Sequence, residues 1–124
     1  MNKIISIILP AKNEALSLPA VIKGIQEQLP DAEIIVVNDG SSDNTAQLAK
    51  AAGARVISHP YSKGNGAAIK TGARAASGDV LVFMDADGQH DPTDIPRLLS
   101  GLDDGHDMVV GARQGGSQAN LGRG

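Results

Sequence analysis

The sequence predicts an α/β fold of three layers, in which a mainly parallel sheet is covered by helices on both faces. Short apolar runs rich in Ile and Val alternate along the chain with segments of helical period. These apolar runs are continuous rather than alternating with polar residues, as expected of strands that are buried on both faces. The repeated strand–helix–strand order implies right-handed crossovers and therefore a parallel sheet.

The position of each element follows from period and from Gly, Pro and capping residues. Apolar runs predict strands at residues 3–9, 33–38, 54–59, 79–84 and 107–112. Helical spacing predicts helices at residues 18–29, 45–52, 65–76 and 92–102. We expect the Ser17 side chain to cap the first helix and the polar residues 41–43 to cap the second. Gly72 should weaken the third helix by about 1 kcal/mol.

The composition of the 124-residue chain fits one domain with an aliphatic core, because Tyr61 and Phe83 are its only Phe, Tyr or Trp residues. The formal charge of −3 and the scarcity of aromatic rings give no reason to expect a nucleic-acid partner. The lack of cysteine excludes disulfides and thiolate metal sites and fits a reducing compartment. No segment has the pattern of a secretory signal or a membrane span. We therefore expect a location in the cytoplasm or at the cytoplasmic face of a membrane.

The domain is expected to occupy residues 1–113. Residues 114–124 are polar and rich in glycine, which suggests the flexible tail of a truncated chain. In a parallel α/β sheet the ligand binds beyond the carboxyl ends of the strands. Polar residues and glycines follow each predicted strand, so this edge of the sheet is where a site is expected.

The most informative of these segments is DADGQHD, after the fourth predicted strand. Side chains two apart on extended backbone point the same way, so Asp85 and Asp87 can face one point in space. Their mutual repulsion requires a cation, and Gln89 adds a neutral oxygen ligand. Oxygen-only ligands favour Mg²⁺ or Mn²⁺. The alternative is that these aspartates cap the next helix, which is the better account of Asp91 because Pro92 follows it.

Other strand ends carry weaker signals. Asp39 can accept hydrogen bonds from a ribose or a base, or it can begin a turn with Gly40. Lys63, within SKGNG, can neutralise a phosphate, although a plain loop explains the segment equally well. Arg113 can neutralise charge on a leaving diphosphate or be an ordinary surface charge.

Two negative observations narrow the choice of function. The segment PAKNE after the first strand has no glycine, which disfavours a dinucleotide-binding Rossmann unit. The histidines His59, His90 and His106 lack zinc-site spacing, and we assign none of them to catalysis.

Taken in order, ILPAKNE, VVNDGSSDNT, YSKGNGAAIKTG, VFMDADGQHDP and VVGAR resemble the donor-binding half of a family-2 glycosyltransferase with the GT-A fold. Within that family the segments are most similar to the dolichyl- or polyprenyl-phosphate sugar transferases. The resemblance implies a Rossmann-like nucleotide-binding half. It also implies an inverting transfer of a sugar from a UDP- or GDP-sugar, with Mg²⁺ or Mn²⁺ and a lipid-phosphate acceptor.

The resemblance also implies roles for individual residues, which fall into three groups. Those near the donor nucleotide are Pro10, Ala11, Glu14, Asp39, Lys63 and Asp85. Those that hold the metal between the protein and the diphosphate are Asp85, Asp87 and Gln89. Those closest to the reacting groups, and therefore catalytic, are Asp87 and Arg113.

A lipid-phosphate acceptor is already an anion, so the reaction would need no strong general base, and the sequence offers no convincing one. The family's catalytic domain continues beyond residue 124, so we expect donor and metal binding but little transferase activity from this chain alone. Two alternatives are a nucleotide-binding domain without catalysis and a haloacid-dehalogenase-type phosphatase. The phosphatase motif would have Thr or Val in place of Gln89. The oligomeric state is left open.

Overall fold

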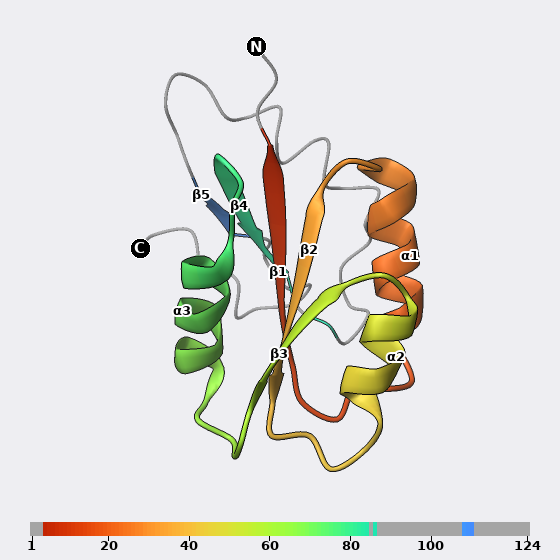
Figure 1. The fold of residues 1–124 in the computed structure, drawn as a ribbon, viewed down its shortest axis with the longest axis vertical. Helices are drawn as coiled ribbons and strands as arrows, with labels where there is room; N and C mark the ends of the chain where they lie inside the picture. Colours follow the sequence, from red (N-terminus) through yellow and green to blue (C-terminus); the bar gives the residue numbers. More distant parts are fainter. Residues whose placement is uncertain (1–3, 85, 87–107, 111–124) are drawn as a thin grey trace, which may run out of the picture.

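A computed structural model of the chain describes residues 4–84, 86 and 108–110. The strands are β1 (Ile5–Ala11), β2 (Glu33–Asp39), β3 (Arg55–His59), β4 (Val80–Phe83) and β5 (Met108–Val110). The helices are α1 (Leu18–Gln28), α2 (Thr45–Ala51) and α3 (Asn65–Ala75). They alternate with the strands along the chain as predicted (Figure 1). The predicted helix at 92–102 and the predicted tail at 114–124 lie outside the described residues.

The strands form one 5-stranded sheet in the order β3-β2-β1-β4-β5, and each neighbouring pair is parallel. The chain therefore builds the sheet from β1 outward to β3 and then returns to place β4 on the other side of β1. This change of direction makes a switch point between β1 and β4, where ligands bind in open α/β sheets. The predicted fold class is confirmed.

Two apolar layers cover the sheet, as Figure 1 shows, with α1 and α2 on one face and α3 on the other. Successive side chains of a strand point to opposite faces, so Ile7 and Leu9 pack with α1 while Ile8 packs with α3. All three side chains are fully buried. The layer beside α3 is completed by small side chains such as Ala68.

Gly72 has a packing role that the sequence did not reveal. A Cβ at this position would collide with Cγ2 of Ile8 on β1, so only glycine lets α3 lie this close to the sheet. The weakened helix propensity is therefore compensated by close packing between α3 and β1. Among the described helices, none is long and apolar enough to cross a membrane.

The capping predictions were partly wrong. Ser17 occupies the N-cap position of α1 without a side-chain capping bond, and its hydroxyl instead donates to the carbonyl oxygen of Ala86 at 2.8 Å. Asp43 accepts from the backbone N–H of Thr45 at 3.0 Å, but the N-cap position of α2 is Asn44, which makes no side-chain capping bond. Ser41 and Ser42 instead bond to Asn13 in the loop after β1. The Ser41 hydroxyl oxygen accepts from the backbone N–H of Asn13, and the backbone N–H of Ser42 donates to the side-chain oxygen of Asn13.

Candidate functional site

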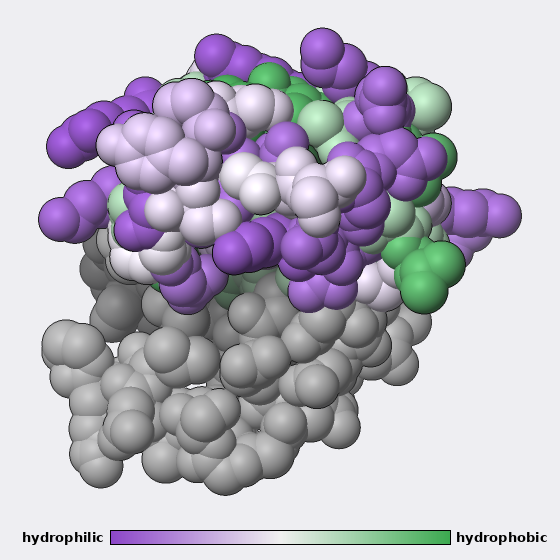
Figure 2. Space-filling model, turned by 90° about the horizontal axis from the view of Figure 1, so that it is seen from below, coloured by the Kyte–Doolittle hydropathy of each residue, from purple (hydrophilic) through white to green (hydrophobic). Residues whose placement is uncertain are grey.

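The loops at the carboxyl ends of the strands enclose an open cavity of about 490 Å³. Figure 2 views the molecule from this side, and hydrophilic residues predominate on its coloured part. The lining residues come from the ends of β1 and β2, from the start of α3 and from the segment after β4. They are Pro10, Ala11, Lys12, Glu14, Asp39, Ser62, Gly64, Asn65, Ala68 and Ala86. The cavity thus lies at the switch point of the sheet.

Asn13 holds the first of these loops in place. It has a left-handed backbone conformation, with φ of 56°, which asparagine tolerates better than most residues. Its side-chain oxygen accepts from the backbone N–H groups of Ser42 and Asp43, at 2.8 and 3.3 Å. The loops after β1 and β2 are therefore joined, which fixes the flanking residues Lys12 and Glu14 at the cavity wall.

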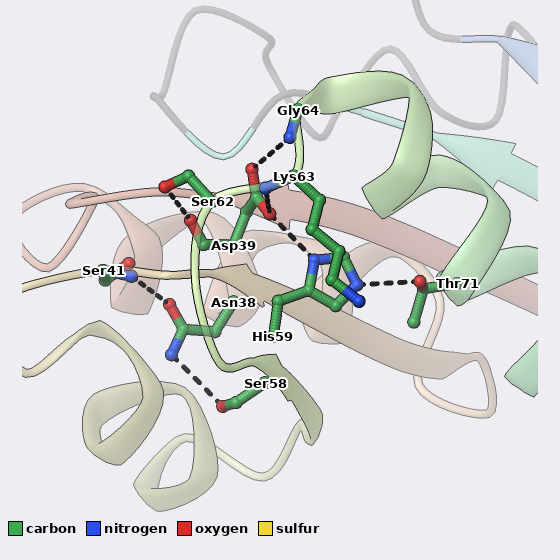
Figure 3. A network of polar contacts seen from close by, with 9 residues as sticks. All are labelled: Asn38, Asp39, Ser41, Ser58, His59, Ser62, Lys63, Gly64 and Thr71. Atoms are coloured by element: carbon green, nitrogen blue, oxygen red, sulfur yellow. Dashed lines mark hydrogen bonds and ion pairs between the residues drawn. The ribbon is translucent and has the colours of Figure 1, made fainter.

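Asp39, the last residue of β2, lines the cavity and accepts three hydrogen bonds through its carboxylate (Figure 3). Its Oδ1 accepts from Nδ1 of His59 and from the backbone N–H of Lys63, both at 2.8 Å. Its Oδ2 accepts from the backbone N–H of Gly64 at 3.0 Å. Burial of the side chain opposes ionisation, but these hydrogen bonds outweigh it and hold the pKa of Asp39 below its ordinary value. Asp39 is therefore a fixed negative charge at the cavity wall.

His59 is the functional candidate that the sequence analysis missed. Its side chain is only 7% exposed, and its Nε2 lies 2.8 Å from the Thr71 hydroxyl on α3. An ionised carboxylate only accepts hydrogen bonds, so Nδ1 carries a proton and donates a hydrogen bond to Asp39. A signal was present in the sequence. His59 ends a predicted strand and Asp39 directly follows another, and the register of these neighbouring strands pairs the two residues.

Lys63 contributes to the site through its backbone. Its N–H donates to Asp39, while its ammonium lies over the ring of Tyr61, 5.4 Å from the centroid. Its chain neighbours Ser62 and Gly64 line the cavity. Contact between the Lys63 side chain and a donor phosphate stays a prediction.

The remaining predicted site residues, Asp85, Asp87, Gln89 and Arg113, lie outside the described residues. Within the described part of the chain, no cluster of His, Cys, Asp and Glu is suited to hold a metal. Ala86 is described, however, and it lines the cavity between the two aspartates in sequence. Asp85 and Asp87 adjoin Ala86 in sequence, and together with Gln89 they offer the kind of oxygen donors that Mg²⁺ and Mn²⁺ prefer, so the chemistry of these residues suits such an ion.

The parallel sheet, with a cavity at its switch point, defines a doubly wound α/β protein. Comparison with known proteins identifies the family. The chain matches the glycosyl transferase family 2 over residues 6–123 and therefore belongs to that family. This assignment favours the glycosyltransferase hypothesis over the phosphatase alternative.

Several relatives support the assignment. The chain is 38% identical over 110 residues to an uncharacterized glycosyltransferase of Mycobacterium tuberculosis, with 89% of this chain and 49% of the relative covered. It is 39% identical over 122 residues to an undecaprenyl-phosphate 4-deoxy-4-formamido-L-arabinose transferase of Salmonella choleraesuis, with 90% and 37% covered. The chain thus spans about half or less of the length of these curated relatives.

Solved structures show the same fold. The glucosyl-3-phosphoglycerate synthase of Mycobacterium tuberculosis in complex with UDP has a TM-score of 0.71 at 36% identity, with 81% of this chain and 40% of that chain covered. A further structure of that enzyme contains Mn²⁺, UDP-glucose and phosphoglyceric acid, and it has a TM-score of 0.70, also at 36% identity, with 80% and 39% covered. The fold is therefore that of GT-A glycosyltransferases.

Proposed function

We propose that the protein contributes the donor-binding half of an inverting glycosyltransferase. The donor is a nucleoside-diphosphate sugar, the cation is Mg²⁺ or Mn²⁺, and the acceptor is a polyprenyl phosphate. The single observation that carries this proposal is the cavity at the switch point. Its lining includes the fixed carboxylate of Asp39 and also Ala86, which lies in sequence between the predicted metal ligands Asp85 and Asp87.

The predicted site residues suit the two parts of a nucleoside diphosphate, the nucleoside and the diphosphate group. Asp39 is ionised and can accept an N–H or O–H group of the nucleoside. Asp85, Asp87 and Gln89 would hold the divalent ion, which when bound stabilises negative charge on the leaving diphosphate. The cavity volume of about 490 Å³ is within the range of small-molecule sites.

The lipid-phosphate acceptor is supported by the Salmonella choleraesuis relative, whose name specifies transfer involving undecaprenyl phosphate. The mycobacterial synthase instead has a structure with phosphoglyceric acid, so both relatives are associated with a phosphorylated compound. An anionic acceptor needs little help from a general base. A lipid acceptor would place the full protein at the cytoplasmic face of a membrane.

Metal-dependent donor binding tests the proposal. Calorimetry with UDP-sugars and GDP-sugars is expected to show binding that strengthens at least about tenfold when Mn²⁺ is present. Asp87→Ala should abolish this metal-dependent part, since it removes a carboxylate ligand. Asp31→Ala, at an exposed position before β2, is the matched control and should bind like the unaltered protein.

Equal binding with and without Mn²⁺, or unchanged affinity in Asp87→Ala, would contradict the metal assignment. Transfer of radiolabelled sugar to polyprenyl phosphate separates the enzyme from a nucleotide-binding domain without catalysis. Because this chain spans only part of its relatives, the transfer assay requires the full-length protein.

A further inference from the structure

The hydrogen bonds of Asp39 restrict what its carboxylate can offer a ligand. An ionised carboxylate has about four acceptor positions, two on each oxygen. Oδ1 already accepts from His59 and Lys63, and Oδ2 accepts from Gly64. From the part of the chain that the structure describes, Asp39 therefore retains one acceptor position, on Oδ2. Because Asp39 lines the cavity, this position is the one available to a bound nucleoside.

His59 cannot easily release the position that it occupies. The ring is buried between β3 and α3 and is held at both nitrogens, by Asp39 and by Thr71, as Figure 3 shows. Nδ1 must donate to Asp39, because the ionised carboxylate only accepts hydrogen bonds, and the Thr71 hydroxyl holds the other side of the ring. Rotation of the ring would break both hydrogen bonds inside the protein, where unpaired polar groups are costly.

The two candidate bases differ in the number of donors they present. Uracil has one ring N–H between two carbonyl groups. Guanine presents an N–H and an adjacent amino group, which a carboxylate satisfies only when both of its oxygens are free. We propose that His59 is a positioning residue that leaves Asp39 a single acceptor and so selects a uracil-type base over a guanine-type base. This inference rests on the proposed function, in which Asp39 faces the base.

The rest of the cavity lining is consistent with this choice. The Lys12 ammonium and the Asn65 amide both line the cavity and can donate to carbonyl oxygens. A uracil-type base has two such oxygens beside its single N–H. Bound guanine would leave one amino N–H without an acceptor at Asp39, and an unpaired donor of this kind lowers affinity by about tenfold or more.

Unaltered protein gives the first test, because it needs no substitution. Calorimetry with excess Mn²⁺ would compare UDP, GDP, inosine diphosphate and N3-methyl-UDP. UDP is expected to bind at least about tenfold tighter than GDP and N3-methyl-UDP. Inosine diphosphate lacks the guanine amino group and so avoids the unpaired donor, and it should bind about tenfold tighter than GDP.

The outcomes separate the two proposals. GDP that binds as tightly as UDP, or at least as tightly as inosine diphosphate, overturns the inference but leaves the proposed function standing. If none of the four nucleotides binds, the proposed function fails and the inference fails with it.

A pair of substitutions tests His59 directly. The amide of His59→Asn can replace Nδ1 and keep the bond to Asp39, whereas the amide of His59→Gln can replace Nε2 and keep only the bond to Thr71. His59→Gln is expected to reduce the UDP-to-GDP affinity ratio about tenfold, and His59→Asn should preserve it. Thermal unfolding verifies that both variants fold. A ratio that changes equally in the two folded variants, or in neither, overturns the role of His59.

Discussion

The two ends of strand β2 carry two carboxylates with similar electrostatics and different surroundings. Glu33, the first residue, accepts from the Ser6 hydroxyl at 2.7 Å and from the backbone N–H of Ser77 at 2.8 Å. Asp39, the last residue, accepts from His59 and two backbone N–H groups. In both cases burial opposes ionisation but hydrogen bonds outweigh it, so the pKa lies below the ordinary value.

What separates the two ends is the cavity. Glu33 joins the start of β2 to β1 and to the segment before β4, and an exposed Arg55 lies 3.7 Å from it. Asp39 is likewise held by hydrogen bonds, from His59, Lys63 and Gly64, yet it also lines the cavity at the switch point. A lowered pKa and a full set of partners therefore mark a structural carboxylate and a candidate ligand-binding one equally well. The position relative to the cavity is what distinguishes them.

The largest expected effect is on UDP affinity, when the charge of Asp39 is removed and that of Glu33 serves as the comparison. Asp39→Asn should weaken Mn²⁺-dependent UDP binding by about tenfold to one-hundredfold, because a charge-assisted bond to the ligand is lost. Glu33→Gln, at the other end of the same strand, should leave UDP affinity within about twofold. Calorimetry measures both, with thermal unfolding as the control for folding. Equal losses in the two variants would show that the two carboxylates do not differ in function.

A second pair of substitutions compares two close-packed glycines, Gly40 at the cavity end of the sheet and Gly78 at the opposite end. Gly40 has φ of 72°, and a Cβ there would lie 2.5 Å from the backbone N of Ser62. A Cβ on Gly78 would lie 2.5 Å from Oγ of Ser6. Changing either glycine to alanine should lower the free energy of unfolding by about 1–3 kcal/mol, but only Gly40→Ala should also weaken UDP binding.

Gly66 provides the control for this pair, because a Cβ there meets no atom within 4 Å. Gly66→Ala should be neutral or stabilise the protein by up to about 1 kcal/mol, since it adds helix propensity at the start of α3. Chemical denaturation measures all three variants. If Gly78→Ala also reduced UDP affinity, the amino end of the sheet would not be independent of the site.

The smallest expected effect is on how the free energy of unfolding changes with pH in the acid range. The pKa of Glu33 lies below its ordinary value of 4.5, so the unfolded chain takes up a proton at this residue before the folded protein does. The stabilisation is complete above that value and is lost as the pH falls through the folded pKa. Glu33→Gln should therefore lose less unfolding free energy between about pH 6 and pH 3 than the unaltered protein.

Urea denaturation at several pH values measures this difference. Glu27→Gln, at an exposed position on α1, is the matched control and should retain the full pH dependence. If Glu33→Gln and Glu27→Gln had the same acid response as the unaltered protein, Glu33 would contribute nothing to the pH dependence of stability.

Local sequence patterns were enough to predict the fold class and the edge of the sheet at which a site is expected. Continuous aliphatic runs specify buried strands, and the alternation with helices specifies parallel pairing, so both conclusions depend on local patterns. Four cavity-lining positions could be predicted for the same reason, because they follow predicted strands. They are Pro10, Ala11, Glu14 and Asp39.

The contacts among these residues could be recognised only from the packing of the folded chain. The pairing of Asp39 with His59, the junction made by Asn13 and the clearance at Gly72 each join segments that are distant in sequence. Such contacts depend on strand register and on the distance between layers, which local patterns do not encode. The sequence therefore predicted the location of the site, and the packing of strands and helices determined how its charge is held.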